Sequence, residues 1–288
     1  MKAKKLVMVL LGCGLAAQIT WAQGSLTPPS APEPSMRTLA QLEPRSPISS
    51  LPYTINMQGA YYLTTNLTGQ AGTNGITITA DNVSLDLNGF ALTGVMGSIA
   101  AIRIDSAITH RNIAIHNGTI CGWGAMGISG HLAEHLIIHD IMAYTNGTVG
   151  IAAGNGSLVT RCTSMGHSSS GFQLYSGSMI TDCIARKNSG AGINLYWDNV
   201  AKENACYDNE KEGIKVSYGG NQVDANKVSY NQTGIRTDFA SGVNLIVRNA
   251  ASGNSTNYSL HATNAVGPIV SCAGSVITNT NPWANFSY

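Results

Sequence analysis

Three charged residues have the types and the spacing that proton transfer, or the binding of an acidic ligand, would need. Lys215 and Arg236 are 21 residues apart, and Asp238 follows two residues later. Basic side chains hold anionic groups through charge-assisted hydrogen bonds, and a neighbouring carboxylate can help a proton transfer or merely neutralise them. We treat these three as candidate catalytic residues. The alternative is that they belong to a solvated polar surface.

Aromatic residues recur at almost the same spacing and form the candidate ligand-binding set: Tyr175, Tyr196, Trp197 and Tyr218, with Phe239 continuing the series. A flat ring with a polar tip suits a wet site, because it stacks on the apolar face of a sugar. We therefore predict a column that contacts a sugar chain, and we add Asn194 as a polar contact. The alternative is that these rings pack against one another and shield a turn.

A repeat sets this spacing. Five Gly-hydrophobic-x-hydrophobic motifs start 21 residues apart, at Gly150, Gly171, Gly192, Gly213 and Gly234. Related motifs start at residues 75, 101 and 127, and a ninth starts at residue 257. A fixed period in this range predicts a solenoid, in which each unit buries its apolar face only against its neighbours.

Each repeat consists of short alternating runs cut by Gly, Asn, Asp and Ser, for example 171–174, 178–180 and 183–185. Such runs are typical of strands, and they leave no room for a helix. We predict an all-β fold, a parallel β-helix with one repeat of about 21–26 residues per coil. Successive coils would stack at the strand spacing of ~4.8 Å.

This arrangement assigns each phase of the repeat to one side of a strand. The inward phase should be a stack of apolar side chains: Ile151, Phe172, Ile193, Ile214 and Ile235. The next phase should form an outward row: Arg103, Ser129, Ala152, Gln173, Asn194, Lys215, Arg236 and Ser259. The candidate catalytic residues therefore come from adjacent coils of one sheet.

The Gly-Ile-x-Leu repeats resemble the right-handed parallel β-helix repeats of the pectate lyase-like superfamily, over about residues 53–260. Residues 61–68 and 76–89 are similar to the first coils of exported bacterial β-helix proteins. The resemblance implies a right-handed fold and carbohydrate chemistry on the outer face of one sheet. Lyases of the group combine carboxylates, often through calcium, with a basic residue, and hydrolases use two or more carboxylates. One scaffold hosts many functions, so it does not imply a particular activity.

We expect no cofactor and no metal site. Calcium would need converging carboxylates, and the sequence shows no such group of three. The motif His131-x-x-Glu134-His135 would need a helix to bind zinc, yet residues 136–141 have the pattern of a strand. In a strand the two histidines would lie ~13 Å apart. His116 and His139, 23 residues apart, should stack at the surface.

Composition excludes some partners. Charged residues make up 11% of the chain and the net charge is +1, whereas a typical globular protein has about 25% charged residues. A nucleic-acid partner would need a basic face, and none is visible. The 32 glycines and 25 asparagines suit the turns of stacked coils, where left-handed backbone and hydrogen-bonded Asn ladders are needed.

The chain divides into four predicted segments. Residues 1–22 have the pattern of a secretion signal, with a basic start, an apolar run and a small-x-small cleavage site. Residues 23–52 are a proline-rich linker, 53–260 the β-helix and 261–288 a C-terminal cap or flank. We expect an exported protein without a membrane span; a lipid anchor at Cys13 is the rival interpretation. Cys162 and Cys183 occupy one phase, which favours a buried stack over a disulfide.

Three functions remain open at this stage. The first is binding of an extracellular polysaccharide, an acidic one among the candidates, with lyase- or epimerase-like modification as an extension. The second is a non-catalytic structural or adhesive rod at the cell surface. The third is a remote hydrolase whose acids are not recognisable. Sparse carboxylates favour binding or structure over hydrolysis.

Overall fold

The computed structural model describes residues 43–288 except 239–241, 273 and 275. The predicted signal peptide, the first twenty residues of the predicted linker, and Phe239 lie outside the described residues. Residues Pro44–Tyr288 form one compact unit. The described part of the chain contains no helix, and hence none long and apolar enough to cross a bilayer.

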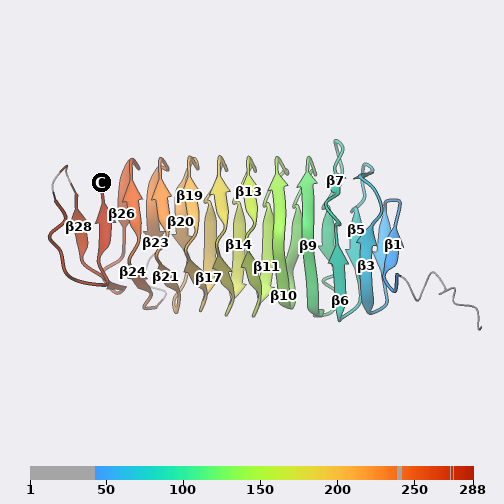
Figure 1. Cartoon of the computed structure of the whole chain (residues 1–288), viewed down its shortest axis with the longest axis horizontal. Helices are drawn as coiled ribbons and strands as arrows, with labels where there is room; N and C mark the ends of the chain where they lie inside the picture. Colours follow the sequence, from blue (N-terminus) through green and yellow to red (C-terminus); the bar gives the residue numbers. More distant parts are fainter. Residues whose placement is uncertain (1–42, 239–241, 273, 275) are drawn as a thin grey trace, which may run out of the picture. The chain divides into compact units, whose positions relative to one another are not determined.

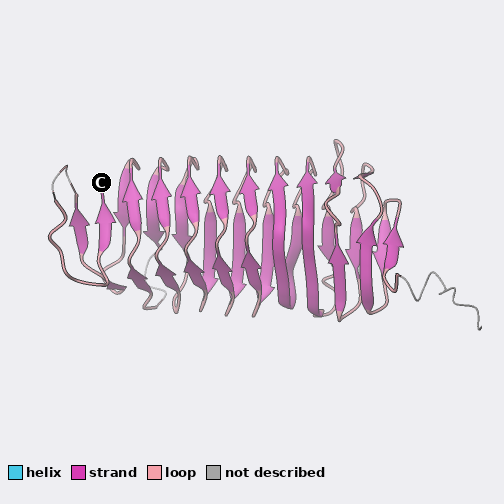
Figure 2. Ribbon diagram, viewed as in Figure 1, coloured by secondary structure: helices cyan, strands magenta, loops and turns pink. Residues whose placement is uncertain are grey.

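Parallel strands stack coil upon coil into a right-handed β-helix with three sheets (Figures 1 and 2). This confirms the predicted fold class. The first sheet has ten strands: β2 (Tyr53–Ile55), β5 (Ile76–Ile78), β8 (Ile102–Ile104), the start of β10 (Ile128–Tyr144), β11 (Ile151–Asn155), β14 (Phe172–Ser176), β17 (Ile193–Trp197), β20 (Glu212–Val216), β23 (Thr233–Thr237) and β26 (Thr256–Ser259).

The other two sheets follow in each coil, and two long strands run from one sheet into the next. The second sheet contains β1 (Ser46–Ile48), β3 (Gly59–Leu63), β6 (Val83–Asp86), parts of β9 (Arg111–Cys121) and β10, β12 (Leu158–Thr160), β15 (Met179–Thr181), β18 (Val200–Lys202), β21 (Gln222–Asp224), β24 (Leu245–Val247) and β27 (Ala265–Val266). The third contains β4 (Leu67–Thr68), β7 (Ala91–Thr93), the ends of β9 and β10, β13 (Thr163–Met165), β16 (Ile184–Arg186), β19 (Ala205–Tyr207), β22 (Lys227–Ser229), β25 (Ala250–Ser252), β29 (Asn285–Ser287) and β28 (Ile269–Ser271).

The apolar core is the inside of these coils. All five residues of the predicted inward stack, from Ile151 to Ile235, are fully buried, and successive members are paired in register. Tyrosines stand at both ends of this stack: Tyr53 pairs with Ile76 and Tyr258 with Ile235. The Tyr258 hydroxyl donates to the carbonyls of Asn249 and Phe286, so its ring closes the last coil.

The solenoid begins earlier than the sequence indicated. β1 pairs in parallel with β3, and Ile48 and Leu51 are buried in the core. The start of the β-helix predicted at residue 53 is therefore too late, because residues 46–51 of the predicted linker already pack on the first coils. The proline-rich composition concealed this strand, because Pro47 lies at the end of the sheet where the lost backbone donor is tolerated. At the other end, β29 pairs with both β25 and β28.

Three ladders of buried polar side chains hold the corners of the coils. In each ladder, a side-chain oxygen accepts the backbone N–H of the ladder residue one coil earlier. The main members of the three ladders are Asn199, Asn221, Asn244 and Asn264; Asn204, Asn226, Asn249 and Asn285; and Asn188, Asn209, Asn231 and Asn254. These amides are paired, as burial requires.

The residue before most ladder positions has a left-handed backbone. Asp198, Glu203 and Asp208 have φ angles of 54°, 57° and 61°, and each is followed by a ladder asparagine. A left-handed residue turns the chain sharply at low cost only where its surroundings fix it. The following amide supplies that support, because its hydrogen bonds tie the turn to the coils on both sides.

Five ladder positions carry other residues, and Ser157 and Ser178 of the first ladder are two of them. Cys162 and Cys183 stand in the second ladder, where the Cys162 N–H contacts Cys183 Sγ and the Cys183 N–H donates to Asn204 Oδ1. Both thiols are buried and free. In the third ladder, His167 Nδ1 accepts the backbone N–H of Asn146, and the His167 N–H donates to Asn188.

We expect the replacement Asn226→Ala to lower the free energy of unfolding by about 3 kcal/mol, because buried ladder groups lose their partners. Asn226 donates to two carbonyls and to Asn249, and its oxygen accepts from Asn204. Chemical denaturation measures the change. The matched control is Asn155→Ala, since Asn155 is exposed and should cost less than about 0.5 kcal/mol. Equal costs for the two variants would contradict the role assigned to the ladder.

Because His167 is buried, we expect the folded protein to lose stability in acid. Burial lowers the pKa of His167 to about 4, whereas an unfolded chain titrates His near its ordinary value of about 6.5. Between these pH values only the unfolded state takes up the proton, so stability falls as the pH is lowered from about 6.5 to 4, by up to about 3 kcal/mol. Denaturation at several pH values should show this loss for the native chain. His167→Asn, which restores the ladder amide, should remove most of the dependence; an identical pH profile for both proteins would refute it.

Candidate functional site

The outer face of the first sheet carries the outward row in the predicted register. Arg103 pairs with Ser129, and the row continues coil by coil to Ser259. Gln173, Asn194 and Lys215 are half-buried, and Arg236 is exposed. One member departs from the prediction: Ala152 is fully buried. The rings of His131 and Tyr175 approach each other at this coil, which is consistent with the cover over Ala152.

The four described aromatic residues of the predicted column form a stack. The ring centroids of Tyr175 and Tyr196 are 4.9 Å apart, and those of Trp197 and Tyr218 are 3.9 Å apart. Tyr196 and Tyr218 join the two pairs at 5.6 Å. The rings therefore pack against one another, which is the alternative that the sequence left open. Their inner faces are used in this packing, so a sugar chain beside the column meets ring edges and hydroxyls.

The tyrosine hydroxyls reach the polar row. Gln173 Nε2 donates to the hydroxyl oxygen of Tyr196 at 2.8 Å and to that of Tyr175 at 3.3 Å. In the next coils, Ser217 Oγ donates to Asn194 Oδ1 at 3.0 Å. The stack and the row thus form one continuous surface, rich in hydrogen-bonding groups with an aromatic border. Trp197 is the most open ring of the column and is 43% exposed.

The structure brings the three candidate catalytic residues together. Asp238 accepts from Lys215 Nζ at 3.1 Å through Oδ2 and from Arg236 Nε at 3.2 Å through Oδ1. Arg236 also donates to Glu212 Oε1 at 3.1 Å. Two cations and two carboxylates therefore form one network, and each cation is already paired. A hollow of about 370 Å³ adjoins it, lined by Arg236, Ser259 and His261 among others.

Glu212 is the member of this network that the sequence reasoning missed. It is 7% exposed and precedes the coil glycine Gly213. The corresponding position in other coils holds Val149, Ser170, Ala191 and Thr233. Aligning the residue before each coil glycine would have singled out Glu212, because it is the one carboxylate among these small or apolar residues.

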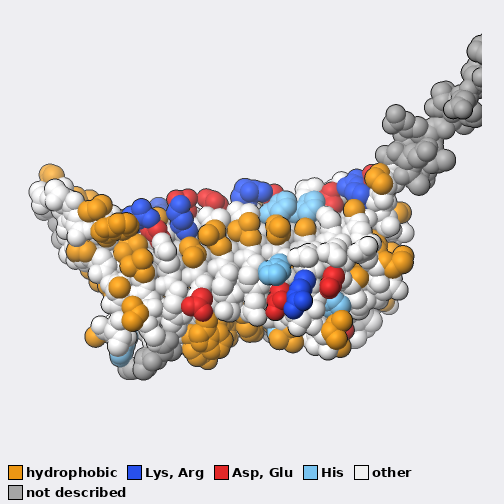
Figure 3. All heavy atoms as spheres, turned by 90° about the horizontal axis from the view of Figure 1, so that it is seen from below, with side chains coloured by type: hydrophobic (Ala, Val, Ile, Leu, Met, Phe, Trp, Pro, Cys, Tyr) orange, Lys and Arg blue, Asp and Glu red, His pale blue; other side chains and the backbone are white. Residues whose placement is uncertain are grey.

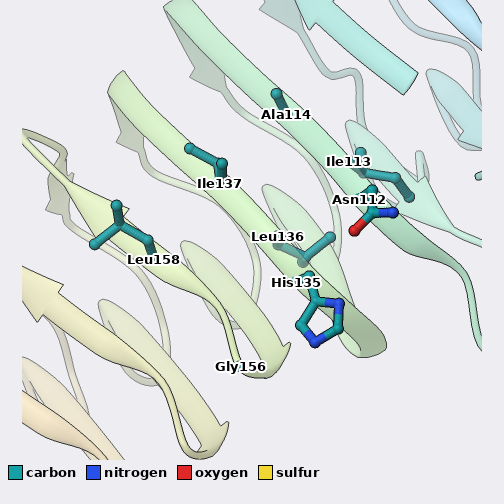
Figure 4. Close-up of a pocket in the computed structure, with 8 residues that line it drawn as sticks. All are labelled: Asn112, Ile113, Ala114, His135, Leu136, Ile137, Gly156 and Leu158. Atoms are coloured by element: carbon teal, nitrogen blue, oxygen red, sulfur yellow. The ribbon is translucent and has the colours of Figure 1, made fainter. Parts of the chain in front are cut away.

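The second sheet presents a different surface, an apolar row. Its members pair in consecutive coils: Ala114, Ile137, Leu158, Met179 and Val200. Figure 3 shows hydrophobic side chains in a line along this side of the solenoid, with charged and histidine side chains along one edge. A shallow hollow lies across the row, where His135 and Asn112 stand at the rim beside Ile137 and Leu158 (Figure 4).

The comparisons with known proteins identify the family. The profile of the family described as "Periplasmic copper-binding protein (NosD)" matches residues 75–270, more than half of the chain. The chain belongs to the NosD family. A search of curated proteins finds no match of significance.

Solved structures show that this NosD-family chain shares the fold of polysaccharide-acting proteins. The A-module of the Azotobacter vinelandii mannuronan C-5 epimerase AlgE4 superposes with a TM-score of 0.60 at 12% identity, over 86% of this chain and 88% of that one. Pectate lyase Pel9A gives 0.56 at 12% identity, over 77% and 68%. The catalytic domain of a GH87 α-1,3-glucanase, in complex with tetrasaccharides, gives 0.56 at 14% identity, over 84% and 58%. At such identities the likeness shows the fold alone.

The described residues do not fit the copper ion that the family description names. His116 and His139 stack as the sequence predicted, with centroids 4.8 Å apart and 3° between the ring planes. Parallel rings direct their lone pairs side by side, so they do not converge on one ion. Nδ1 of His139 lies 2.7 Å from Asp140, and Nδ1 of His116 lies 3.7 Å from Asp86.

The cysteines do not supply a copper site either. A thiol binds metal as the thiolate, and burial raises the pKa of the Cys183 and Cys206 thiols well above the usual range. Across residues 43–288, apart from the five undescribed positions, no three His, Cys, Asp or Glu side chains are grouped to hold a metal. We therefore assign no copper chemistry to the described part of the chain.

The ion network predicts unequal effects of its members on stability. Glu212→Gln should lower the free energy of unfolding by about 1–2 kcal/mol, because a nearly buried acceptor loses its charge-assisted bond. Lys215→Gln should cost less than about 0.5 kcal/mol, since Lys215 forms a single, partly exposed ion pair. Denaturant titration at low and high salt distinguishes the two. A larger loss from Lys215→Gln than from Glu212→Gln would contradict the assignment of Glu212 as the anchor.

Proposed function

We propose that the protein is exported and binds a polysaccharide along the outer face of its first sheet. The observation that carries the proposal is the continuous polar surface from Gln173 to Arg236, bordered by the aromatic stack. Equivalent residues recur at ~4.8 Å, close to the length of one sugar unit. The family is described as periplasmic, and the predicted signal in residues 1–22 agrees with export.

Each predicted site residue has a definite role in this proposal. Asn194 and the hydroxyls of Tyr175 and Tyr196 donate to and accept from sugar hydroxyls. Trp197, which is 43% exposed, and Tyr218 stacked on it offer the exposed part of the stack to a sugar. Three of the neighbouring structures are of enzymes named for mannuronan, pectate and α-1,3-glucan, which supports a carbohydrate ligand on this fold.

Modification of the polysaccharide is the less favoured extension. A general base must present a free lone pair to the substrate, whereas an ammonium such as Lys215 has donors only. In the structure, the Asp238 oxygens accept from Lys215 and Arg236. Lyase- or epimerase-like chemistry would therefore require substrate to displace one of these ion pairs. Binding requires no such exchange.

The alternative is a non-catalytic structural or adhesive rod at the cell surface. One observation favours it: the aromatic rings and the charges of the first sheet satisfy one another within the protein. A rod would need the stack for stiffness and no ligand at all. A glycan-binding measurement therefore decides between the two functions.

We expect the double replacement of Trp197 and Tyr218 by Ala to reduce retention on an oligosaccharide array at least tenfold, because the exposed part of the stack is lost. Both residues lie outside the core, so circular dichroism should still show the native β-helix. Tyr207→Ala is the matched control, since Tyr207 packs on Arg186 in the third sheet. If the native protein retains no acidic or neutral glycan, the binding proposal fails and the rod takes its place.

A further inference from the structure

The upstream half of the same face holds a cation without a carboxylate partner. Lys215 and Arg236 are both neutralised by carboxylates. Arg103 occupies the same row, is half-buried, and donates through Nη2 to the hydroxyl of Ser106 at 3.2 Å. Among residues 43–288, as far as the structure describes them, no carboxylate forms an ion pair with Arg103. The charge available to a ligand therefore lies upstream, away from the candidate catalytic residues.

A break in the repeat follows Ser129, the partner of Arg103 in the row, and contains a histidine. The pairing of β10 with β11 shifts between Gly130 and Glu134, so residues 131–133 bulge from the sheet. The bulge lies against Gly154 of the next coil, where an added Cβ would be 1.9 Å from the carbonyl oxygen of Ala133. Beyond this close contact, the His131 ring approaches that of Tyr175, with centroids 5.8 Å apart.

The surroundings of His131 define its hydrogen-bonding role. Its Nδ1 is buried and lacks a protein partner among the described residues, so a proton on that nitrogen would be unsatisfied. Burial, with the charge of Arg103 as a second cause, lowers the pKa of His131. Nε2 is not among the buried unpaired atoms and is the ring nitrogen left to form a hydrogen bond with a ligand. His131 thus offers a hydrogen-bonding nitrogen two residues beyond Ser129, the partner of Arg103.

We propose that Arg103 and His131 form an anion-binding subsite, at which a carboxylate or sulfate substituent of the polysaccharide is recognised. This inference rests on the proposed function. A guanidinium presents a planar fork of donors that suits both oxyanions. Ser129, which pairs with Arg103 in the row, adds a hydroxyl to the same surface. Six coil steps separate this subsite from Arg236, which corresponds to ~29 Å at the strand spacing.

Asp105 is the residue directly after strand β8 and follows Arg103 by two positions. It forms no ion pair with Arg103 within the described residues, and its negative charge would oppose an anionic ligand. Replacing Arg103 and replacing Asp105 should therefore have opposite effects on the affinity for an anionic sugar. Removal of the Arg103 charge should weaken binding of an anionic sugar, and removal of the Asp105 charge should strengthen it.

The test measures affinity by calorimetry for three oligosaccharides of equal length: a uronate, a sulfated and a neutral one. Arg103→Gln should weaken binding of an anionic oligosaccharide at least tenfold and leave neutral binding unchanged. Asp105→Asn should strengthen anionic binding severalfold. Arg186→Gln, on the third sheet, is the control and should change neither. Arg103→Lys keeps the charge without the planar fork of donors, so its affinity for an anionic oligosaccharide should lie between those of the native protein and Arg103→Gln. Such an intermediate affinity would show that the loss in Arg103→Gln does not come from a folding defect.

The outcomes separate this inference from the function on which it rests. If the native protein binds the three oligosaccharides equally, and Arg103→Gln changes nothing, the anion subsite is wrong and polysaccharide binding stands. If no oligosaccharide binds, both proposals fail. A preference for the uronate over the sulfated ligand, or the reverse, identifies the anionic group. A preference that Lys215→Gln abolishes and Arg103→Gln does not would overturn the assignment to Arg103.

Discussion

The hydrogen-bonded ladders at the three corners are the constraint on which the rest of the structure depends. A coil of 21 residues has few apolar side chains facing inward, and its turns leave backbone groups inside the solenoid. One asparagine per corner satisfies those groups and also binds the coil on either side, as Asn204 does with Asn226 and Ile180. Because each amide has partners in neighbouring coils, a shift of register would leave buried donors unpaired. Register is thus fixed at the corners and inherited by all three sheets.

Fixed register explains both the strength and the limits of the candidate site. Residues of equal phase meet at strand spacing, so Tyr175 stacks on Tyr196, and Asp238 meets the cations of two coils. The same alignment brings the side chains of neighbouring coils into contact with one another. Rings that stack in a column lose the faces that a sugar would use, and opposite charges in a column neutralise. A regular solenoid therefore tends to satisfy its own surface.

The sequence predicted what the repeat determines. The glycine spacing indicated the β-helix, the inward stack and the outward row, because all three depend only on phase. It did not reveal features that depend on neighbours of different phase. The ion network includes Glu212 from the position before the glycine. β1 was missed because one short strand, rich in proline and serine, carries no repeat. The spacing of the aromatic residues along the sequence does not give the distances between their rings, so it could not show whether the rings of the column stack on one another.

Departures from the repeat are where a ligand can find groups that the protein has not already satisfied. One extra residue between the ladder positions Asn199 and Asn221 shifts Tyr218 by one place, so that it stacks on Trp197 at 3.9 Å as well as contacting Tyr196. The bulge at residues 131–133 lies against the bare backbone of Gly154 and holds His131 two residues beyond Ser129, the partner of Arg103 in the row. Arg103 itself lies in a coil whose neighbours in the row, Thr77 and Ser129, bring no charge. Regular coils supply the scaffold and its spacing, and these irregular coils supply the unpaired donors from which selectivity for a ligand can arise.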